Sequence, residues 1–595
     1  MKNVYILGIY DGHLATATLL KNGQIVASVS EERFTGIKNY SGSPYKSIDY
    51  LLKSEGITGG DLAMVVVPQK WGVPVFSDPK VQESDRLLSF SVAVYKPLGI
   101  LRRYWGILEY HYPSLAKIRR PLYELAFKII GGRTIRKHRE YIAKYLKIPL
   151  DKVRSYEHHL AHAAAAYYES PYNKKDALVL TIDGEGDLIS ASVNTVRKGK
   201  FRRLAATPSD ASLGWIYYEI TGFLGMKRNE HEYKVMGLAP YAKEYGVLPL
   251  FEKIKDLITI DPQNLLKFHA KFDTHLMGLF TKEKLQEERF DYIAGAFQKL
   301  VEDRVSEWAG NAIKRTGLKT VCLGGGVAMN VKANLKIAEL PEVKELFISP
   351  SAGDETTPAG ACYLGYVDYC REHRIEVRVS PMGPLYLGPS FDNSYIEKFL
   401  KKGRYQRKYK IKFDKNIERT VARLLVKGKV VGRLSGKMEW GARALGNRSI
   451  LADPSNPDIV RVINEQMKMR DFWMPFTPSI LAEKVKNYVI NSKNIPAPYM
   501  ILTFHSTELA KKHIRAAMHP YDFTLRPQIL EESWNPEYYK IIKEFEKITG
   551  IGGVLNTSFN LHGYPIVLGP EEAMHAFENS GLEYVALGNY LVSKR

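Results

Sequence analysis

Three histidines in an alanine-rich segment are the first residues of this sequence that suggest chemistry. His158, His159 and His162 lie in SYEHHLAHAAAAYYES. The alanine run favours a helix, and on a helix His158 and His162 lie one turn apart on the same face. That spacing lets two imidazole nitrogens reach one metal ion. Judged on spacing alone, a packed or surface histidine cluster is the commoner explanation.

Two aspartates are candidates to complete such a metal site. Asp183 ends the apolar run of residues 178–183, and Asp354 follows the apolar run of residues 346–348. A carboxylate placed at the end of a buried strand can reach a metal ion from across the fold. A set of two nitrogen and two oxygen ligands suits Fe(II), Mn(II) or Zn(II), and the spacing does not choose among them.

Three glycine-rich turns follow predicted strands or precede predicted helices. Glycine allows a backbone to approach phosphate oxygens closely, and a helix N-terminus favours an anion. Tight turns also use glycine for purely steric reasons, so each turn alone is a weak signal. Together they resemble the turns of actin-like nucleotide-binding folds, and none matches a P-loop or dinucleotide fingerprint. The turns are residues 183–186, 324–326 and 353–354.

Basic and hydroxyl side chains recur in the C-terminal third of the sequence. Arg443 and Arg448 lie in GKMEWGARALGNRSILADP, and a predicted helix carries Lys468 and Arg470. Guanidinium and ammonium groups suit a triphosphate or another phosphorylated substrate. Judged by charge alone, surface salt bridges are the commoner explanation. The set is completed by Arg526 in DFTLRPQ and by Asn556 and Ser558 in VLNTSFNLHGYPIV, whose apolar flanks indicate a cleft.

Alternating strands and helices must position these residues, so the fold class is α/β. Strands are predicted at residues 4–9, 16–20 and 25–29, with an Asn22-Gly23 hairpin turn between the last two. A helix is expected at 44–53, and strand–turn–helix units recur up to residue 375. Residues 71–150, rich in aromatic and basic residues, are expected to form a largely helical insertion. Further helices are predicted at 212–223 and 290–315, and further strands at 178–183, 321–323 and 346–348.

Composition indicates a large globular protein with an excess of positive charge. The chain has 595 residues, 85 Lys and Arg against 64 Asp and Glu, and a net charge of +21. The excess gathers in residues 102–152 and 398–415, and it can serve anionic substrates, nucleic acid or a membrane surface. No stretch is long enough to cross a bilayer, and no signal peptide is evident, so we expect a cytoplasmic protein without a membrane partner. Its three cysteines form no CxxC pair.

A series of short motifs in fixed order resembles a known family. The sequence is similar to the carbamoyltransferase family of nodulation-factor and antibiotic biosynthesis (NodU/CmcH type). The resemblance runs from residue 7 to residue 593, and the number and order of the motifs make it specific. The motifs are DGHLATATLL, EERF, HHLAHAAAA, TIDGEGD, EYKVMGLAPY, GGGVAMN, SAGD, MEWGARALGNRSILADP, LRPQ, NTSFN and GNYLV.

The resemblance implies two domains with separate tasks. Residues 1–377 are expected to form an actin-like (ASKHA-type) nucleotide-binding domain that transfers the carbamoyl group, with the insertion at about 71–150. After a linker at 378–397, residues 398–595 are expected to form a YrdC-like α/β domain. That domain is expected to make carbamoyladenylate from carbamoyl phosphate and Mg-ATP. The acceptor is a hydroxyl of a small molecule, for which a sugar, an aminoglycoside, a nucleoside or a lipid head group would serve.

The resemblance also gives the candidate residues their roles. His13 is expected to act as general base toward the acceptor hydroxyl, although it can equally cap a turn, and Asp11 to orient the acceptor or the imidazole. The metal ligands would be His158, His162 and Asp354 with Asp183 as an addition, and Fe(II) is favoured over Mn(II) or Zn(II). Carbamoyl phosphate and ATP contacts are assigned to Arg443, Lys468, Arg526, Asn556, Ser558, Arg448 and Arg470. Contacts to the nucleotide in the N-terminal domain are assigned to Gly184, Gly325, Gly326, Asn330 and Lys234.

One departure from the family pattern and two other functions stay open. The family commonly reads FRPF where this sequence has Trp473-Met474-Pro475-Phe476. Either Arg470 or Arg448 replaces the missing guanidinium, or carbamoyl phosphate binds more weakly. The positive charge also allows a macromolecular acceptor such as tRNA, and a catalytically silent nucleotide-binding regulator is the alternative from another class. A homodimer is an open possibility.

Overall fold

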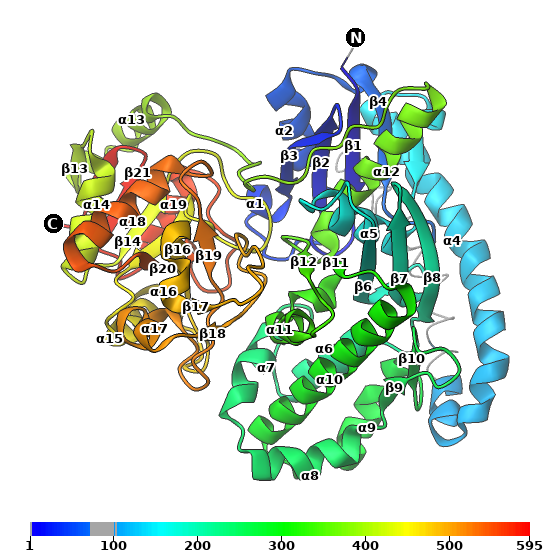
Figure 1. Ribbon diagram of the computed structural model, residues 1–595. Coiled ribbons are helices and arrows are strands. Elements are labelled where there is room, and N and C mark those ends of the chain that lie inside the picture. The colour runs from blue at the N-terminus through cyan, green and yellow to red at the C-terminus, as the bar shows by residue number, and fades with distance from the viewer. Residues whose placement is uncertain (1–2, 72–99, 101–103) are drawn as a thin grey trace. The chain divides into compact units, whose positions relative to one another are not determined.

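The computed structural model describes residues 3–71, 100 and 104–595 (Figure 1). The chain forms two compact units. Unit 1 comprises residues 1–31 and 39–382, and unit 2 comprises residues 32–38 and 383–595. The short segment 32–38, which contains α1 (Glu32–Thr35), therefore belongs to unit 2, although the residues on either side of it in the sequence belong to unit 1. Nothing in the sequence pattern suggested this.

Unit 1 contains two five-stranded mixed sheets with the same strand order. In each sheet an antiparallel meander of three strands is followed by two parallel strands, in the orders β3-β2-β1-β4-β5 and β8-β7-β6-β11-β12. The first sheet consists of β1 (Tyr5–Tyr10), β2 (Thr16–Lys21), β3 (Gln24–Ser30), β4 (Leu62–Val67) and β5 (Val153–Ser155). The second consists of β6 (Ala177–Gly186), β7 (Ile189–Arg197), β8 (Lys200–Pro208), β11 (Thr320–Gly324) and β12 (Glu345–Ile348).

Two closely packed helices connect these sheets. The helix α5 (His158–Tyr168) contacts β6 and β11, and α12 (Thr357–Glu372) contacts β1, β2 and β4. The two helices also contact each other, and a Cβ atom added to Gly360 would lie only 1.8 Å from the carbonyl oxygen of Ala161. Small residues let the helix backbones approach this closely. The alanine run of α5 therefore fixes the helix that carries the histidines against the one that follows Asp354.

Further helices surround the second sheet (Figure 1). The long helix α10 contacts α6, α7, α8 and α11. The remaining elements of unit 1 are α2 (Tyr45–Glu55), α4 (Ala116–Leu146), α6 (Leu213–Phe223), α7 (Glu232–Leu238), α8 (Glu244–Ile254), β9 (Ile258–Ile260), β10 (Phe268–Ala270), α9 (Met277–Lys284), α10 (Phe290–Thr316) and α11 (Val331–Glu339).

Unit 2 is built on one eight-stranded mixed sheet, in the order β13-β22-β21-β14-β15-β20-β16-β19. Its strands are β13 (Lys410–Phe413), β14 (Val431–Leu434), β15 (Arg448–Ala452), β16 (Thr477–Leu481), β19 (Gln528–Leu530), β20 (Gly553–Ser558), β21 (Tyr584–Leu587) and β22 (Tyr590–Ser593). A small second sheet pairs β17 (Val489–Ile490) with β18 (His505–Ser506). The helices are α13 (Asn393–Lys402), α14 (Ile417–Val426), α15 (Asp458–Ile463), α16 (Val485–Tyr488), α17 (Glu508–His513), α18 (Pro536–Thr549) and α19 (Pro570–Glu578).

The α/β class is confirmed, and most predicted elements lie where the sequence pattern placed them. Two local predictions are wrong. Residues 183–186 do not form a turn, because β6 continues to Gly186 through an irregularity that begins after Ile182. Lys468 and Arg470 do not share a regular helix, because a π-helical segment, Asn464–Lys468, ends there and Met469 takes a left-handed conformation with a φ of 44°.

The described part of the predicted insertion is helical, as expected. It comprises a helix at residues 104–111 and the long α4. Residues 72–99 and 101–103 of the insertion lie outside the described residues.

Candidate metal and anion sites

The four predicted metal ligands come together in unit 1. One ligand atom from each of His158, His162, Asp183 and Asp354 lies within 4.8 Å of the other three. The two imidazole Nε2 atoms are 3.1 Å apart, and each lies 3.2 Å from Oδ2 of Asp183. Bonds of about 2.0–2.2 Å to one metal ion place neighbouring ligand atoms roughly 3.0–3.5 Å apart. The donor set and its spacing therefore fit a single divalent cation.

Strand ends and a helix N-terminus position these ligands. Because β6, β11 and β12 are parallel, their carboxyl ends meet at one edge of the sheet. Asp183 lies at that edge on β6, and Asp354 follows β12 in the turn before α12. The first turn of α5 supplies His158, whose backbone N–H donates to Asp187, while Glu157 caps the same helix by accepting from the next two N–H groups.

The histidines and carboxylates of the cluster shift one another's pKa values. Burial alone would lower the pKa of both histidines, but the two carboxylates beside them outweigh it and raise both pKa values. In turn, the histidines hold the pKa of Asp183 well below its usual range, although burial acts in the opposite direction. The carboxylates and the imidazoles therefore stabilise each other's charged forms.

The middle histidine of the motif has a different role. His159 is buried, with Nδ1 2.8 Å from the Thr181 hydroxyl and Nε2 2.9 Å from the carbonyl oxygen of Ile189. Burial lowers the pKa of His159 to about 3, so the ring is neutral. His159 therefore anchors α5 to the second sheet and faces away from the ligand set.

The turn after β1 lies beside this cluster and holds the predicted catalytic pair. The Tyr10 hydroxyl donates to Oδ2 of Asp354 at 2.5 Å, which links the turn to a candidate metal ligand. Asp11 is only 1% exposed, and its carboxylate lies 2.9 Å from Nε2 of His138 on α4. The ring of His13 is half-buried and makes no hydrogen bond or ion pair with any described residue. A proton acceptor is therefore accessible at His13, whereas Asp11 is enclosed.

Sequence reasoning missed Tyr10 and His138. Tyr10 directly precedes the aspartate of the turn, which was a local signal. His138 lies 127 positions from Asp11 in a segment without a matching motif, so only the fold brings the two together.

The glycines predicted to bind a nucleotide in unit 1 have packing roles in the structure. Gly326 donates its backbone N–H to Oδ1 of Asp183 at 3.0 Å. Gly325 has a φ of 94°, and an added Cβ would lie 2.2 Å from the Ile182 carbonyl oxygen. Glycine is required at both positions to bring this turn against the strand that carries the ligand. Gly184, by contrast, has open space where a Cβ would point.

Of the two other predicted nucleotide contacts, one precedes a helix and one lies on a helix. Asn330 accepts the N–H of Ala333 and so caps α11, and its side-chain amide also pairs with Gln298. Asn330 is thereby engaged in holding α11 against α10. Lys234 lies half-buried on α7.

Three arginines gather in unit 2 near the end of β20. Arg526 lies close enough to Arg443 and Arg470 for both cations to lower its pKa, in addition to the larger effect of burial. Arg526 makes no hydrogen bond or ion pair with any described residue. Arg470 donates to the Thr557 hydroxyl at 3.3 Å and lies 5.1 Å from the centre of the Phe476 ring. Like charges held together at a partly buried position favour binding of an anion.

Lys468 adds an ammonium group to this cluster. It is 2% exposed and donates to Ser558 and Asn560 through both their side-chain and backbone oxygens. Burial, Arg470 and Lys38 lower the pKa of Lys468 well below its usual range. Lys38 lies in segment 32–38, which a hydrogen bond from Arg33 to the Gly441 carbonyl joins to the rest of unit 2. Asn560 and Lys38 were not among the predicted residues, although Asn560 is the last residue of the NTSFN motif.

Two predicted anion contacts are enclosed in the structure. The guanidinium of Arg448 is fully buried and donates to backbone carbonyls of Leu568, Ser435, Gly436, Asn447 and Pro389. The Asn556 amide is 1% exposed and donates to Ala444, Ser479 and Gln528. Arg448 and Asn556 therefore shape the loops around the cluster and do not face a ligand.

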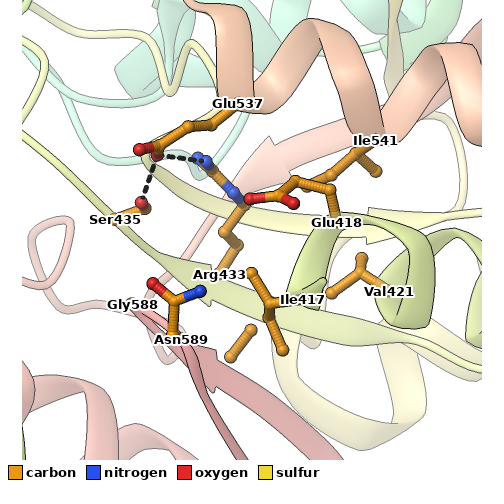
Figure 2. Close-up of a pocket in the computed structure, with 10 residues that line it drawn as sticks. Ile417, Glu418, Val421, Arg433, Ser435, Glu537, Ile541, Gly588 and Asn589 are labelled. Carbon is orange, nitrogen blue, oxygen red and sulfur yellow. Dashed lines mark hydrogen bonds and ion pairs between the residues drawn. The ribbon is translucent and has the colours of Figure 1, made fainter. Parts of the chain in front are cut away.

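A separate hollow of about 20 Å³ lies elsewhere in unit 2, between β14, α14 and α18 (Figure 2). Arg433 points into it, but its guanidinium already donates to Glu537, Asn447 and the Gly446 carbonyl. The hollow has room for about one water molecule. It contains none of the candidate residues.

Within the described residues, no helix is long and apolar enough to span a membrane.

Comparison with protein families identifies both parts of the chain. The model described as "Carbamoyltransferase N-terminus" matches residues 5–363, and "Carbamoyltransferase C-terminus" matches residues 422–594. Together these matches cover both the candidate metal ligands and the basic cluster.

Individual relatives agree with this result. The chain is 32% identical to MJ1051, an uncharacterized protein of Methanocaldococcus jannaschii, over 99% of both chains. It is 31% identical to sll1178, an uncharacterized protein of Synechocystis sp., over 99% of this chain and 97% of that one. Nodulation protein NolNO of Sinorhizobium fredii is 27% identical, over 98% of this chain and 79% of that protein.

Among solved structures, full-length HypF in its phosphate- and nucleotide-bound form aligns with 60% of this chain and 55% of its own. The identity is 15% and the TM-score 0.30, so this likeness carries no weight in the argument. The matches to both family models, and relatives similar over nearly the whole length, are decisive: the chain belongs to the carbamoyltransferase family and is a carbamoyltransferase.

Proposed function

We propose that the protein is an ATP-dependent O-carbamoyltransferase that performs two half-reactions in its two units. Unit 2 hydrolyses carbamoyl phosphate to carbamate and inorganic phosphate, and the carbamate attacks Mg-ATP to form carbamoyladenylate and release pyrophosphate. Unit 1 then transfers the carbamoyl group to a hydroxyl of a small molecule. Unit 1 corresponds to the proposed actin-like domain, which its two sheets of identical strand order support. Unit 2 corresponds to the proposed YrdC-like domain.

The observation that carries the proposal is the unpaired guanidinium of Arg526. A partly buried arginine without a hydrogen-bonding partner, beside two further arginines, is costly unless an anion binds there. Carbamoyl phosphate and the phosphates of ATP are anions of this kind. Arg443, Arg470 and Arg526 would neutralise the phosphate oxygens. Lys468 would hold the Ser558 loop in place and remain near the charge that develops when pyrophosphate leaves.

In unit 1, the proposed role of His13 is to take the proton of the acceptor hydroxyl as the new C–O bond forms and AMP leaves. An imidazole that is half-buried and makes no hydrogen bond with any described residue can accept that proton. The proposed ligands of a divalent cation are His158, His162, Asp183 and Asp354. Such an ion would supply a positive charge that polarises a carbonyl or phosphoryl oxygen. Tyr10 would keep Asp354 in place by its hydrogen bond.

The insertion has a proposed positioning role in this site. Asp11 lies two residues before His13, and its buried carboxylate is held by His138 of α4. The pair would fix the backbone of the turn and therefore the direction in which the His13 ring points. Asp11 is then a positioning residue and does not contact the acceptor.

A rescue experiment tests the division of labour. The Arg526→Gln variant should lose carbamoyl-phosphate-dependent pyrophosphate release, and supplied synthetic carbamoyladenylate should restore its carbamoyl transfer. The His13→Asn variant should still release pyrophosphate and should not transfer the group, with or without the supplied adenylate. The opposite rescue pattern would refute the assignment of the half-reactions to the two units. Release of pyrophosphate without carbamoyl phosphate would refute the proposed substrate.

A further inference from the structure

The long helix α4 of unit 1 has two ion-paired side chains on one face and exposed apolar side chains on the opposite face. Its inner face carries Arg120, which pairs with buried Asp210, and His138, which pairs with buried Asp11. These two residues are 18 positions apart, which corresponds to five helical turns and places them on one face. These two contacts to buried carboxylates fix the orientation of α4 about its own axis.

The opposite face carries a row of exposed apolar side chains. Ile118, Leu122, Leu125 and Ile129 follow each other at intervals of four, three and four residues, so they form one stripe along the helix. They are 56%, 65%, 59% and 52% exposed, respectively. We call these four residues the outer stripe. Three further exposed apolar residues, Tyr104, Leu108 and Tyr112, precede it at intervals of four residues.

Such a surface is unusual for a helix of a globular protein. A surface helix normally buries its apolar stripe against the core and exposes its charges. The N-terminal half of α4 does the reverse, and its inner charge pairs prevent the helix from rotating to hide the stripe. A continuous exposed apolar patch marks a surface that contacts something else.

Charge indicates what that contact is. The sequence of α4 has nine Lys and Arg residues against two Glu. On the outer face, exposed Arg133 and Arg136 follow Ile129 by four and seven positions, so cationic groups continue the line of the stripe. A second copy of this chain would bring the same positive charges together. Nucleic acid would match the charge but would leave the apolar stripe in water.

We propose that the outer face of α4 docks on the surface of an anionic membrane. The outer stripe would enter the boundary between head groups and acyl chains, with the helix lying in the plane of the membrane. Arg133 and Arg136 would meet the lipid phosphates. Tyrosines such as Tyr104 and Tyr112 suit the same interfacial depth. This contact is peripheral, and it revises the expectation from sequence that the protein has no membrane partner.

Vesicle sedimentation with the full-length protein tests the proposal. The wild type should sediment with vesicles of phosphatidylcholine that contain phosphatidylglycerol, and less with phosphatidylcholine alone. High salt should weaken the binding, because head-group attraction is screened. The Leu122→Gln/Leu125→Gln variant should bind at least tenfold more weakly. Ile548→Gln on α18 of unit 2 is the matched control, since Ile548 is also exposed, at 51%, and should have no effect.

Three results would overturn the proposal. One is a wild type that does not bind anionic vesicles. Another is a wild-type dimer that the double variant converts to a monomer, as measured by light scattering, because the stripe would then be an interface between copies. The third is a large drop in the melting temperature of the double variant, because a segment of the same chain would then cover the stripe. Pyrophosphate release should be unchanged in the double variant, so failure of this proposal is distinguishable from failure of the proposed half-reactions.

Discussion

The ligand cluster of unit 1 and the basic cluster of unit 2 are organised in opposite ways. In unit 1, two imidazoles and two carboxylates face one another within 4.8 Å, so opposite charges compensate each other. In unit 2, Arg443, Arg470, Arg526 and Lys468 lie close enough to perturb one another through like charge. In our proposal the first cluster holds a small cation, and the second binds an anion that neutralises its like charges.

The two clusters also differ in what holds them in place. The ligands of unit 1 lie on strand ends and on a helix that packs through alanine and glycine, so regular elements determine their geometry. The basic groups of unit 2 lie mainly on loops beside β20 and after a π-helical segment, and buried polar contacts hold those loops. We therefore expect substitutions in unit 1 to act on metal occupancy and those in unit 2 on substrate affinity.

The largest expected effect is loss of metal from unit 1. His158→Ala and His162→Ala should each reduce the metal content of the purified protein at least tenfold, because removing one of four ligands weakens a site severely. Elemental analysis by mass spectrometry is the measurement. His159→Gln is the matched control, because His159 faces Thr181 and Ile189, and its metal content should stay normal. Full metal content in the His158 variant would disprove the assignment.

The difference between the clusters explains how much of each was predictable from sequence. Helical periodicity and strand ends marked all four candidate ligands in unit 1, since an i, i+4 pair and residues that follow parallel strands converge by geometry, and the family resemblance gave them their role. In unit 2, residue type alone could not separate Arg526, which has no partner, from Arg448, which donates to five carbonyl groups. Both are arginines in polar motifs, and only the loop conformations distinguish them.

Long-range pairs were beyond sequence reasoning for the same reason. Neither Lys38 beside Lys468 nor His138 beside Asp11 has a spacing that marks it, because each pair joins segments about a hundred or more residues apart. The π-helical segment before Met469 was likewise hidden, because its residues also suit an α-helix. The α/β class and most elements were predictable because hydrophobic periodicity and turn residues are local signals.

In unit 2, removing the unpaired guanidinium should weaken phosphate binding by one to two orders of magnitude. A charge-assisted hydrogen bond is worth about 1.5–3 kcal/mol, so Arg526→Gln should raise the dissociation constant for carbamoyl phosphate roughly 10- to 150-fold. Isothermal titration calorimetry measures it. Arg461→Gln removes a guanidinium from an exposed ion pair with Glu465 on the same unit and should change the constant little. Equal effects of both variants would contradict a specific anion site.

Proton uptake provides a finer test of the strain in unit 2. Burial, Arg470 and Lys38 lower the pKa of Lys468, so a fraction of this lysine is neutral at high pH. A bound anion favours the charged form and raises that pKa, so binding should take up protons, with an uptake of up to about one per site between the two pKa values. Without ligand, the folded protein binds this proton less tightly than the unfolded chain does, because the pKa of Lys468 is lowered only in the folded state. The free energy of unfolding should therefore decrease as the pH falls from the ordinary lysine pKa toward the lowered one. Calorimetry in buffers of different ionisation enthalpy measures the uptake, and Lys468→Met should abolish it; proton release on binding would contradict this account.

The smallest expected effect concerns Met474, where the family pattern has an arginine. Met474 is 8% exposed, while Arg470 already reaches Thr557 and lowers the pKa of Arg526. If Arg470 fills the vacant role, Met474→Arg should leave the KM for carbamoyl phosphate unchanged within about twofold, because a further cation only adds repulsion. Arg470→Met alone should raise KM roughly tenfold.

The double exchange, Arg470→Met with Met474→Arg, should recover most of that loss, since one guanidinium again faces the phosphate. Steady-state kinetics of the four proteins form a double-mutant cycle. A several-fold lower KM for Met474→Arg alone would instead mean that the missing arginine weakens the natural site and that Arg470 does not replace it.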